Sequence, residues 1–355
     1  MADRAQEAAV AARLLAAFEA KGAQVVTPDC LQPAALLLDL YGESIRARAY
    51  TAHDPVDGEL MLRPDFTVPV AQAHFTSGRG AARYAYAGPV WRRQDPGSAR
   101  GRENWQAGFE VFEAEDPAEA EALVFSTITS AVAASGATPR TGDLGFIFAA
   151  IAGLKTTETR KAALRRHVWR PGRFSRLLAR YAGTVPFEVD SRTLPKPPSP
   201  EADLPGRRGA ADVAARLEAL EADRQAPALA KEEVALFSRI TSLAGPSDDC
   251  HHRLAALAAE FPSLDVPVAA FARRLEAFDR SGIAPAGIPF DGGFGRQSME
   301  YYDGFVFAFE VGDGPAVAQG GRYDPLTAVL GGGQATPAVG GVVRPAVLAE
   351  LEGRA

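Results

Sequence analysis

The strongest constraint on the fold is a pair of strand-like runs that enclose a polar stretch containing glycine and arginine. The first run covers residues 84–92 and the second covers residues 109–113. Two such runs around a polar segment are typical of an antiparallel hairpin with a long loop. The remaining elements lack the regular alternation of strand and helix that builds a parallel sheet, and no internal repeat is visible. The sequence therefore argues against a parallel α/β fold.

Two polar residues on the returning strand of this hairpin, Gln106 and Glu110, are four positions apart. Side chains alternate between the two faces of a strand, so both emerge on one face. That face could hold an ammonium group. Polar residues alternating with apolar ones are equally typical of a strand face that is simply solvated, so spacing alone leaves both interpretations open.

Hydrophobic periodicity predicts the other elements around the hairpin. A helix is expected at residues 4–21, ended by Gly22, and a strand at residues 24–28. Further helices are expected at residues 31–41, 67–75 and 119–134. The sequence becomes glycine-rich, aromatic and strand-like after Pro289, and it ends in a short apolar stretch at residues 345–351.

The middle of the chain differs from both ends. Residues 184–209 contain too many prolines for regular structure and predict a loop or linker. Residues 155–181 and 210–278 on either side look helical and carry no motif with a recognisable chemistry. We expect three parts: a first core segment at 1–140, a mainly helical insertion at 141–285, and a last core segment at 286–355.

Composition excludes several classes of protein. The 355 residues, 47% of them hydrophobic, suffice for a large core, and no run of roughly 18 apolar residues predicts a membrane span. We expect a cytoplasmic protein. Cys30 and Cys250 lie far apart without metal-ligand spacing, so neither a disulfide framework nor a metal site is predicted, and no cofactor is expected. The net charge of -6 does not favour nucleic-acid binding.

Four blocks of sequence carry a resemblance to a known family. They read LRPDFT at 62–67, YAGPVWRRQDPGSARGRENWQAGFEVFE at 86–113, FGRQSMEYYDGFVFAFE at 294–310, and GGRYDPLTAVLGGGQATPAVGG at 320–341. In this order and spacing they resemble the catalytic core of histidyl-tRNA synthetase, a class II aminoacyl-tRNA synthetase. The resemblance spans most of the chain. It implies an α+β fold with an antiparallel sheet flanked by helices, a helical insertion between the second and third blocks, and a homodimer.

The resemblance also implies a histidine site. Residues matching Gln106 and Glu110 bind the amino group and the imidazole side of histidine in the family, and Asp65 and Thr67 complete the pocket. The full set implied to bind histidine is Asp65, Thr67, Arg92, Gln106, Glu110, Arg296, Tyr301 and Tyr302. Tyr301 and Tyr302 match the pair that contacts the ring, and Arg296 lies close to the arginine that neutralises the carboxylate. An amino acid needs such complementary groups for its ammonium, its carboxylate and its ring.

Departures from the family pattern fall mainly on the nucleotide side. Gln94 replaces a glutamate that helps to hold the nucleotide, and Val347 occupies the position of the arginine that clamps the triphosphate. Arg344 lies three residues early and precedes Pro345, so it is not expected to emerge at the same point. Nucleotide transfer needs positive charge where phosphate charge accumulates. We therefore expect no catalytic residues.

The amino-acid side departs less. Arg296 is one residue further from Tyr301 than in the family, and Asp65 and Phe66 stand where glutamate and glycine are usual. The last block ends at Gly341 and the sequence at Ala355. The anticodon-binding domain that follows this block in the family needs on the order of 100 residues. No such domain is expected.

These features together resemble the synthetase-like proteins that serve as regulatory subunits of ATP phosphoribosyltransferase. That resemblance implies a non-catalytic protein that assembles with the short-form catalytic subunit of that enzyme, with L-histidine as inhibitor. Two rivals remain: a divergent but active aminoacyl ligase, and a tRNA-binding sensor, although tRNA binding is not favoured because no strongly basic tail is present. The sequence leaves open whether histidine binds the synthetase-like pocket or the interface with the catalytic subunit.

Overall fold

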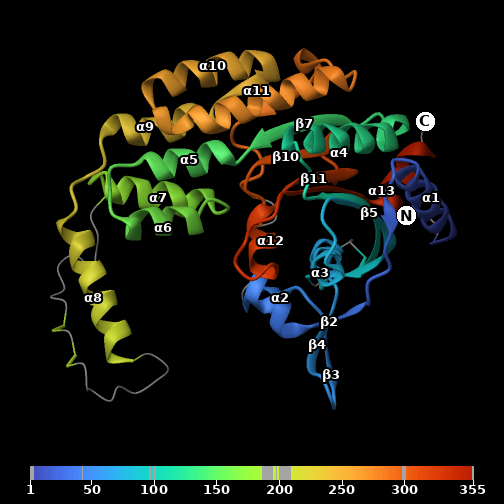
Figure 1. Ribbon diagram of the computed structural model, residues 1–355, viewed down its shortest axis with the longest axis horizontal. Coiled ribbons are helices and arrows are strands. Elements are labelled where there is room, and N and C mark those ends of the chain that lie inside the picture. Colours follow the sequence, from blue (N-terminus) through green and yellow to red (C-terminus); the bar gives the residue numbers. More distant parts are fainter. Residues whose placement is uncertain are drawn as a thin grey trace.

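The computed structural model of the chain is dominated by one large sheet with helices on both faces (Figure 1). It describes residues 4–41, 43–95, 97–98, 101–185, 195–196, 198–199, 209–297 and 301–353. Most of the proline-rich stretch expected as a loop at 184–209 lies outside the described residues.

In the part of the chain that the structure describes, the large sheet has nine strands in the order β1-β5-β6-β12-β11-β10-β7-β9-β8. All neighbouring strands run antiparallel except the pairs β1–β5 and β7–β9 near its two edges. In sheet order, the strands are β1 (Gln24–Val25), β5 (Ala82–Trp91), β6 (Glu103–Phe112), β12 (Ala338–Val343), β11 (Ala318–Arg322), β10 (Phe305–Glu310), β7 (Thr138–Asp143), β9 (Pro289–Asp291) and β8 (Ala244–Pro246).

The predicted hairpin is confirmed as β5 and β6, which pair from Ala82 opposite Phe112 to Trp91 opposite Glu103. The returning strand starts at Glu103, earlier than the expected residue 109, because its first half pairs fully with the end of β5. Gln106 and Glu110 lie on this strand opposite Gly88 and Tyr84. On its other side β6 pairs with β12, which brings Gly340 opposite Glu110.

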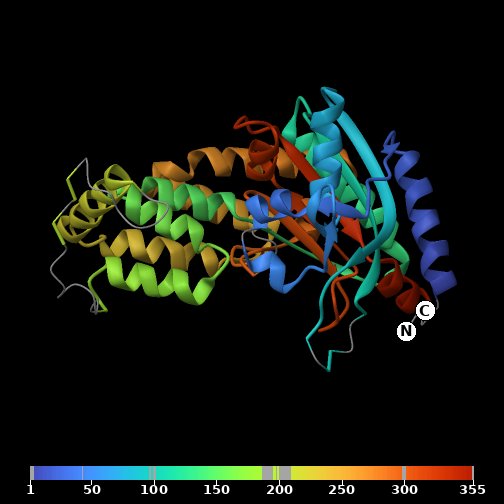
Figure 2. The same cartoon turned by 90° about the horizontal axis from the view of Figure 1, so that it is seen from below.

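Three of the described helices cover one face of the sheet. They are α1 (Arg4–Glu19), α4 (Pro117–Val132) and α13 (Pro345–Glu352). Phe18 of α1 packs on Phe109 of β6, with ring centroids 5.9 Å apart, and Phe125 of α4 packs on Phe307 of β10 at 5.3 Å. Figure 2 shows α1 on the opposite side of the hairpin from α2. The other face is therefore left for different elements.

That second face is covered by helices and by a small sheet of order β2-β4-β3. The helical elements are α2 (Ala34–Tyr41), the 3-10 helix at Glu43–Ala47, α3 (Thr67–Ser77) and α12 (Asp324–Leu330), and the strands are β2 (Leu31–Pro33), β3 (Thr51–Asp54) and β4 (Gly58–Leu62). The helix expected at 31–41 begins only at Ala34, because residues 31–33 form β2 and pair with β4.

The predicted helical middle forms a layer beside the β7 end of the sheet (Figure 1). Its helices are α5 (Gly145–Gly153), α6 (Glu158–Arg166), α7 (Pro171–Tyr181), α8 (Ala210–Gln225), α9 (Lys231–Thr241), α10 (Ser247–Glu260) and α11 (Asp265–Arg280). Short 3-10 turns lie at Ala133–Ser135, Pro262–Leu264 and Pro285–Gly287. β8 interrupts the expected helical run at 210–278 and joins the sheet through β9.

A buried ionic cluster ties this helical layer to the sheet. The guanidinium of Arg274 on α11, which is 2% exposed, donates to Asp143 at 2.7 Å and to Glu121 at 3.1 Å. Arg322 of β11 lies 3.4 Å from Glu121 and also pairs with Asp324 at 2.6 Å. Burial raises the pKa of Glu121, and the Arg274 charge opposes that shift. The arginine is therefore a buried counterion shared by the two carboxylates.

We expect Arg274→Ala to lower the free energy of unfolding by about 3–5 kcal/mol, because buried Asp143 loses its cation and buried Glu121 keeps only Arg322. Urea denaturation measures this change. The matched control is Arg273→Ala, at an exposed neighbour on the same helix. That substitution should change stability by less than about 0.5 kcal/mol, as is usual for an exposed site. Similar small effects of both substitutions would contradict the structural role of the cluster.

Candidate functional site

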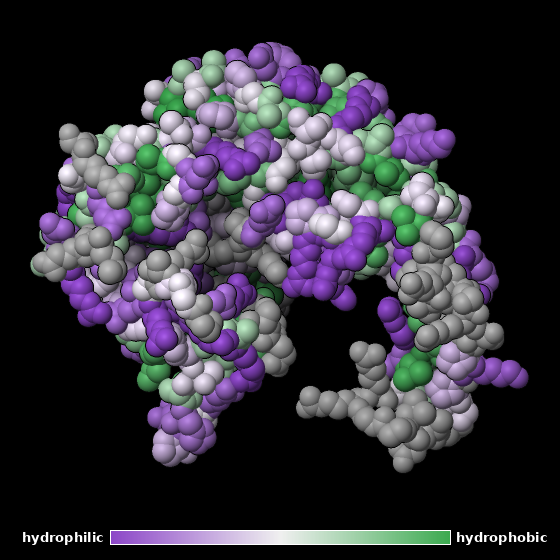
Figure 3. All heavy atoms as spheres, turned by 180° about the vertical axis from the view of Figure 1, so that it is seen from behind, coloured by the Kyte–Doolittle hydropathy of each residue, from purple (hydrophilic) through white to green (hydrophobic). Residues whose placement is uncertain are grey.

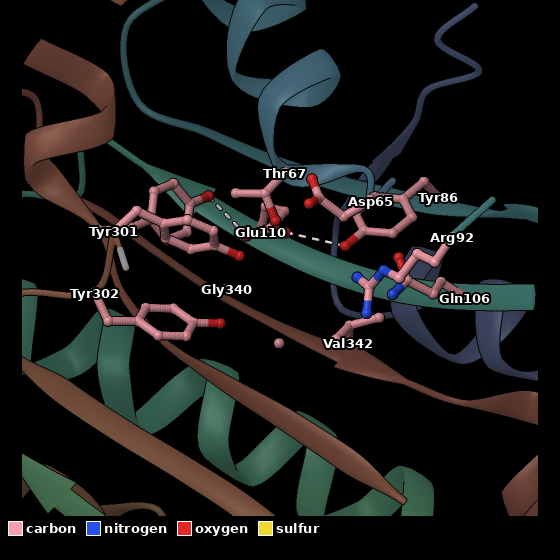
Figure 4. Close-up of a pocket in the computed structure, with 12 residues that line it drawn as sticks. Asp65, Thr67, Tyr86, Arg92, Gln106, Glu110, Tyr301, Tyr302, Gly340 and Val342 are labelled. Carbon is pink, nitrogen blue, oxygen red and sulfur yellow. Dashed lines mark hydrogen bonds between the residues drawn. The ribbon is translucent and has the colours of Figure 1, made fainter. Parts of the chain in front are cut away.

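A polar pocket opens on the second face of the sheet, where β5, β6 and β12 lie side by side (Figure 4). Its lining comes from β5 and β6, from β12, from the start of α3 and from the chain before β10. The lining residues are Asp65, Thr67, Tyr86, Arg92, Gln106, Glu110, Tyr301, Tyr302, Tyr323, Gly340, Gly341 and Val342. Of the eight residues proposed from the sequence, the structure brings together all except Arg296.

Glu110 lies in the middle of the pocket and is 2% exposed. Its carboxylate accepts a hydrogen bond from the Tyr323 hydroxyl at 2.7 Å and another from the Tyr86 hydroxyl at 3.1 Å. Burial raises the pKa of Glu110 to about 7, although both tyrosine hydrogen bonds act in the opposite direction. Among the described residues, no cation is ion-paired with it. The pocket therefore holds a carboxylate that a bound cation would stabilise.

Two glycines make room for this arrangement. A Cβ at Gly108, which lies between Gln106 and Glu110, would come within 2.2 Å of the Tyr86 hydroxyl. A Cβ at Gly340 on the neighbouring strand would lie 1.4 Å from a carboxylate oxygen of Glu110. Both glycines thus allow close approach across the sheet, which is one of the few reasons for glycine inside a strand.

The two ends of the pocket differ in chemistry. Figure 4 shows Tyr301 and Tyr302 on one side of Glu110, and Arg92 and Gln106 on the other. The two tyrosine rings lie 4.8 Å apart, and burial raises the pKa of Tyr302. Arg92 is fixed by a hydrogen bond from its Nε to the Pro64 carbonyl at 2.8 Å. One end is therefore aromatic and the other is cationic.

The start of α3 supplies the remaining predicted residues. Asp65 and Thr67 are 7% and 8% exposed, and Phe66 between them stacks on Tyr86 with ring centroids 4.3 Å apart. This stacking fixes both the strand tyrosine and the beginning of the helix. Thr67 is the first residue of α3, so its side chain is presented at the helix terminus that faces the sheet.

Arg296 does not lie among the lining residues, although the sequence proposed it as the partner of a carboxylate. Its Nε donates to the Val168 carbonyl at 3.2 Å, and its guanidinium lies 4.8 Å from the centroid of the Phe174 ring. The carbonyl and the aromatic face of the helical layer hold the cation there. Among the described residues, the arginine that lines the pocket is Arg92.

Tyr86 and Tyr323 were not proposed from the sequence, yet both hold Glu110. The pKa of each tyrosine is raised well above its usual value, foremost by burial, so both hydroxyls stay protonated and donate. A signal for Tyr86 existed in the alternation of β5, because it shares a strand face with residues opposite Gln106 and Glu110. Tyr323 follows β11, and its approach to Glu110 depends on the order of the strands.

A second cavity of about 330 Å³ adjoins the pocket and shares Arg92 and Gln106 with it. Gln94, Trp105, Gln319 and Arg344 also line it, together with the uncharged Val347. The Arg344 guanidinium donates to Gln319 at 2.8 Å and to the Ala316 carbonyl.

The pocket around Glu110 is nearly closed in this conformation. It encloses only about 10 Å³. A space of that size holds about one water molecule. A larger ligand must therefore displace side chains of the pocket or extend into the second cavity.

Other classes of site are not indicated. Among the described residues, no three His, Cys, Asp or Glu side chains are grouped as metal ligands would be. Cys30 is exposed and Cys250 is buried. None of the described helices combines the length and the apolar character needed to cross a membrane.

Comparison with known proteins places this chain in a family. Residues 2–173 and 209–348 match the family model described as histidyl-tRNA synthetase. The ATP phosphoribosyltransferase regulatory subunit of Mesorhizobium japonicum is 30% identical, over 94% of this chain and 94% of its own length. That of Rhizobium meliloti is 31% identical over 94% and 93%. The chain belongs to this family of histidyl-tRNA synthetase-like regulatory subunits.

Solved structures agree on the fold. An ATP phosphoribosyltransferase regulatory subunit/histidyl-tRNA synthetase from Bacillus halodurans aligns with a TM-score of 0.68 at 19% identity, covering 99% of this chain and 81% of that one. A histidine–tRNA ligase subunit from Alicyclobacillus acidocaldarius aligns with a TM-score of 0.61 at 23% identity, covering 100% and 96%. The predicted family and the class II synthetase-like fold are both confirmed.

We expect Gly340→Ala to destabilise the protein by about 1–3 kcal/mol or more, because overpacking forces side chains and backbone to shift. The new methyl group would overlap the Glu110 carboxylate. Urea denaturation tests this directly. Gly287→Ala is the matched control, since a Cβ there meets no atom within 4 Å. If the two variants had equal stability, the close approach of β12 to Glu110 would be refuted.

Proposed function

We propose that this chain is a non-catalytic regulatory subunit that activates a short-form ATP phosphoribosyltransferase and carries the histidine that inhibits it. Family membership supports the regulatory role. The proposal for histidine depends on one observation above all, the buried Glu110 carboxylate without an ion-paired cation among the described residues, between an aromatic end and an arginine end. The working unit would be a homodimer of this chain within a hetero-oligomer.

Histidine matches the pocket group by group. Its ring suits the end formed by Tyr301 and Tyr302, where aromatic contacts and hydroxyls are available. Its carboxylate suits Arg92, whose planar guanidinium can bind both oxygens. Its ammonium or ring N–H groups suit Glu110 and Gln106. Because the pocket is nearly closed, histidine must displace side chains as it enters or extend into the second cavity, and any such movement supplies a difference between the free and bound states.

The residues of the second cavity support the proposal that this chain does not act as a ligase. Formation of an aminoacyl adenylate requires positive charge where pyrophosphate leaves. Val347 contributes none to the second cavity, where the described arginines are Arg92 and Arg344, and Arg344 is oriented by hydrogen bonds to Gln319 and the Ala316 carbonyl. We infer that the amino-acid half of an ancestral site is retained for sensing, whereas the half that activates ATP is lost.

Activity should appear only in a mixture of the two subunits. We expect this chain to raise the rate at which the short-form catalytic subunit joins ATP to phosphoribosyl pyrophosphate, and added histidine to lower that rate. The same chain alone should show no histidine-dependent exchange of pyrophosphate into ATP. An unchanged phosphoribosyl-transfer rate together with no complex on gel filtration would disprove the regulatory role, and measurable exchange would show an active ligase.

Histidine binding should depend on the charge of Glu110. Glu110→Gln keeps the shape and should weaken binding about 5- to 150-fold in calorimetry, because a charged hydrogen bond worth about 1–3 kcal/mol is lost. In the wild type, the carboxyl takes up a proton as the pH falls below about 7. Affinity should then fall by up to about tenfold per pH unit. The variant controls for histidine's own titration and should lack this extra slope. Equal affinities would place histidine elsewhere.

A further inference from the structure

The charge of this chain is distributed unevenly, and the helical layer carries the exception. The whole chain has 38 lysines and arginines against 44 carboxylates. The segment from Lys155 to Tyr181, which contains α6 and α7, holds nine of those basic residues and a single carboxylate, Glu158. Nothing in the pocket around Glu110 explains this concentration of positive charge.

The fold turns part of this charge to the surface. On α7 the apolar residues Phe174, Leu178 and Tyr181 are buried against the rest of the layer. Arg173 and Arg176 are exposed, and helical geometry puts them away from that buried face. Arg166 at the end of α6 is also exposed. Figure 3 shows hydrophilic residues gathered where the helical layer borders the hollow of the molecule.

The exposed arginines differ from the structural ones in the same segment. Arg160 is buried and donates a hydrogen bond to Asp223 at 2.6 Å. Glu158 forms ion pairs with Lys161 at 3.1 Å and with Arg165 at 3.5 Å. Across the described chain, Arg166, Arg173 and Arg176 have no carboxylate within ion-pair distance. Like charges three or four apart on a helix destabilise it by a few tenths of a kcal/mol. Arg173 and Arg176, which are three apart on α7, therefore repel each other on that helix.

We propose that the basic face formed by Arg166, Arg173 and Arg176 is the docking surface for the catalytic subunit of ATP phosphoribosyltransferase, which would present carboxylates to it. This inference rests on the proposed function. Arginine forks bind carboxylates through paired hydrogen bonds and are favoured at protein interfaces. In Figure 1, α6 and α7 lie at the end of the molecule away from α1 and α13, so a partner could contact them without covering those helices.

A protein partner fits this face better than a nucleic acid does. Sites for single strands place aromatic rings beside their basic residues so that bases can stack. Here the aromatic residues of α7, Phe174 and Tyr181, are buried on the inner face of that helix instead. The net charge of -6 also repels a polyphosphate at long range, whereas carboxylates on a protein need only local complementarity.

The test is a calorimetric titration of this full chain with the catalytic subunit at low and at moderate salt. We expect the double variant Arg173→Glu/Arg176→Glu to bind at least about tenfold more weakly at low salt, with the difference shrinking as salt screens the charges. Arg253→Glu/Arg273→Glu, which reverses two exposed arginines on α10 and α11, is matched in charge and should bind like the wild type. Histidine affinity should be equal in all three proteins, which verifies folding.

Each other outcome has a definite meaning. A wild-type complex that both double variants form equally well overturns the docking surface and leaves the regulatory role standing. A wild type that forms no complex refutes the regulatory role, and the docking surface with it. If instead the basic-face variant keeps the complex but loses binding to mixed tRNA that the wild type shows at moderate salt, the face binds nucleic acid and the inference is overturned.

Discussion

The functional face of this protein depends on one buried carboxylate, that of Glu110 on β6, an interior strand of the large sheet. A carboxylate removed from water is costly unless hydrogen bonds or a cation compensate it. Here two tyrosine hydroxyls compensate it partly, and its pKa of about 7 shows that the compensation is incomplete. Glycines on β6 and β12 leave the space that Glu110 and Tyr86 occupy. The pocket is thus built around a buried carboxylate that has no ion-paired cation among the described residues.

The order of the strands brings residues from distant parts of the sequence together around Glu110. β12 inserts between β6 and β11, so residues near position 110 meet residues near positions 323 and 340. The same sheet carries the buried Arg274 cluster at its other end, where the helical layer is attached. Arg322 belongs to that cluster and Tyr323, the next residue, belongs to the pocket. Two adjacent residues of the chain therefore belong to the cluster and to the pocket.

Much of this could be predicted from the sequence because it depends on short-range patterns. The hairpin follows from two apolar runs around a polar segment, and the shared face of Gln106 and Glu110 follows from strand alternation. What failed depends on tertiary context. Residues 31–33 pair with β4 rather than extend a helix. Tyr323 approaches Glu110 only through the order of the strands.

The location of Arg296 also required the structure, because its contacts are the carbonyl of Val168 and the ring of Phe174, more than a hundred residues away in sequence. A cation can be held by whichever acceptor and aromatic face the fold brings near, and neither leaves a periodic signal. Arg92, by contrast, lies on the same hairpin as Gln106 and reaches the pocket as the resemblance implied. Proximity along the hairpin explains the difference.

The central claim is that a positively charged group of bound histidine pairs with the Glu110 carboxylate. The pKa of the Glu110 carboxyl tests this pairing most directly. NMR observation of the ¹³C-labelled glutamate side chains, with Glu110→Gln to assign the signal, measures that pKa with and without saturating histidine. The account predicts a pKa of about 7 in the free protein and a clear decrease when histidine binds, because a nearby cation favours the charged form. A pKa that histidine leaves unchanged, in a protein shown by calorimetry to be saturated, would contradict it.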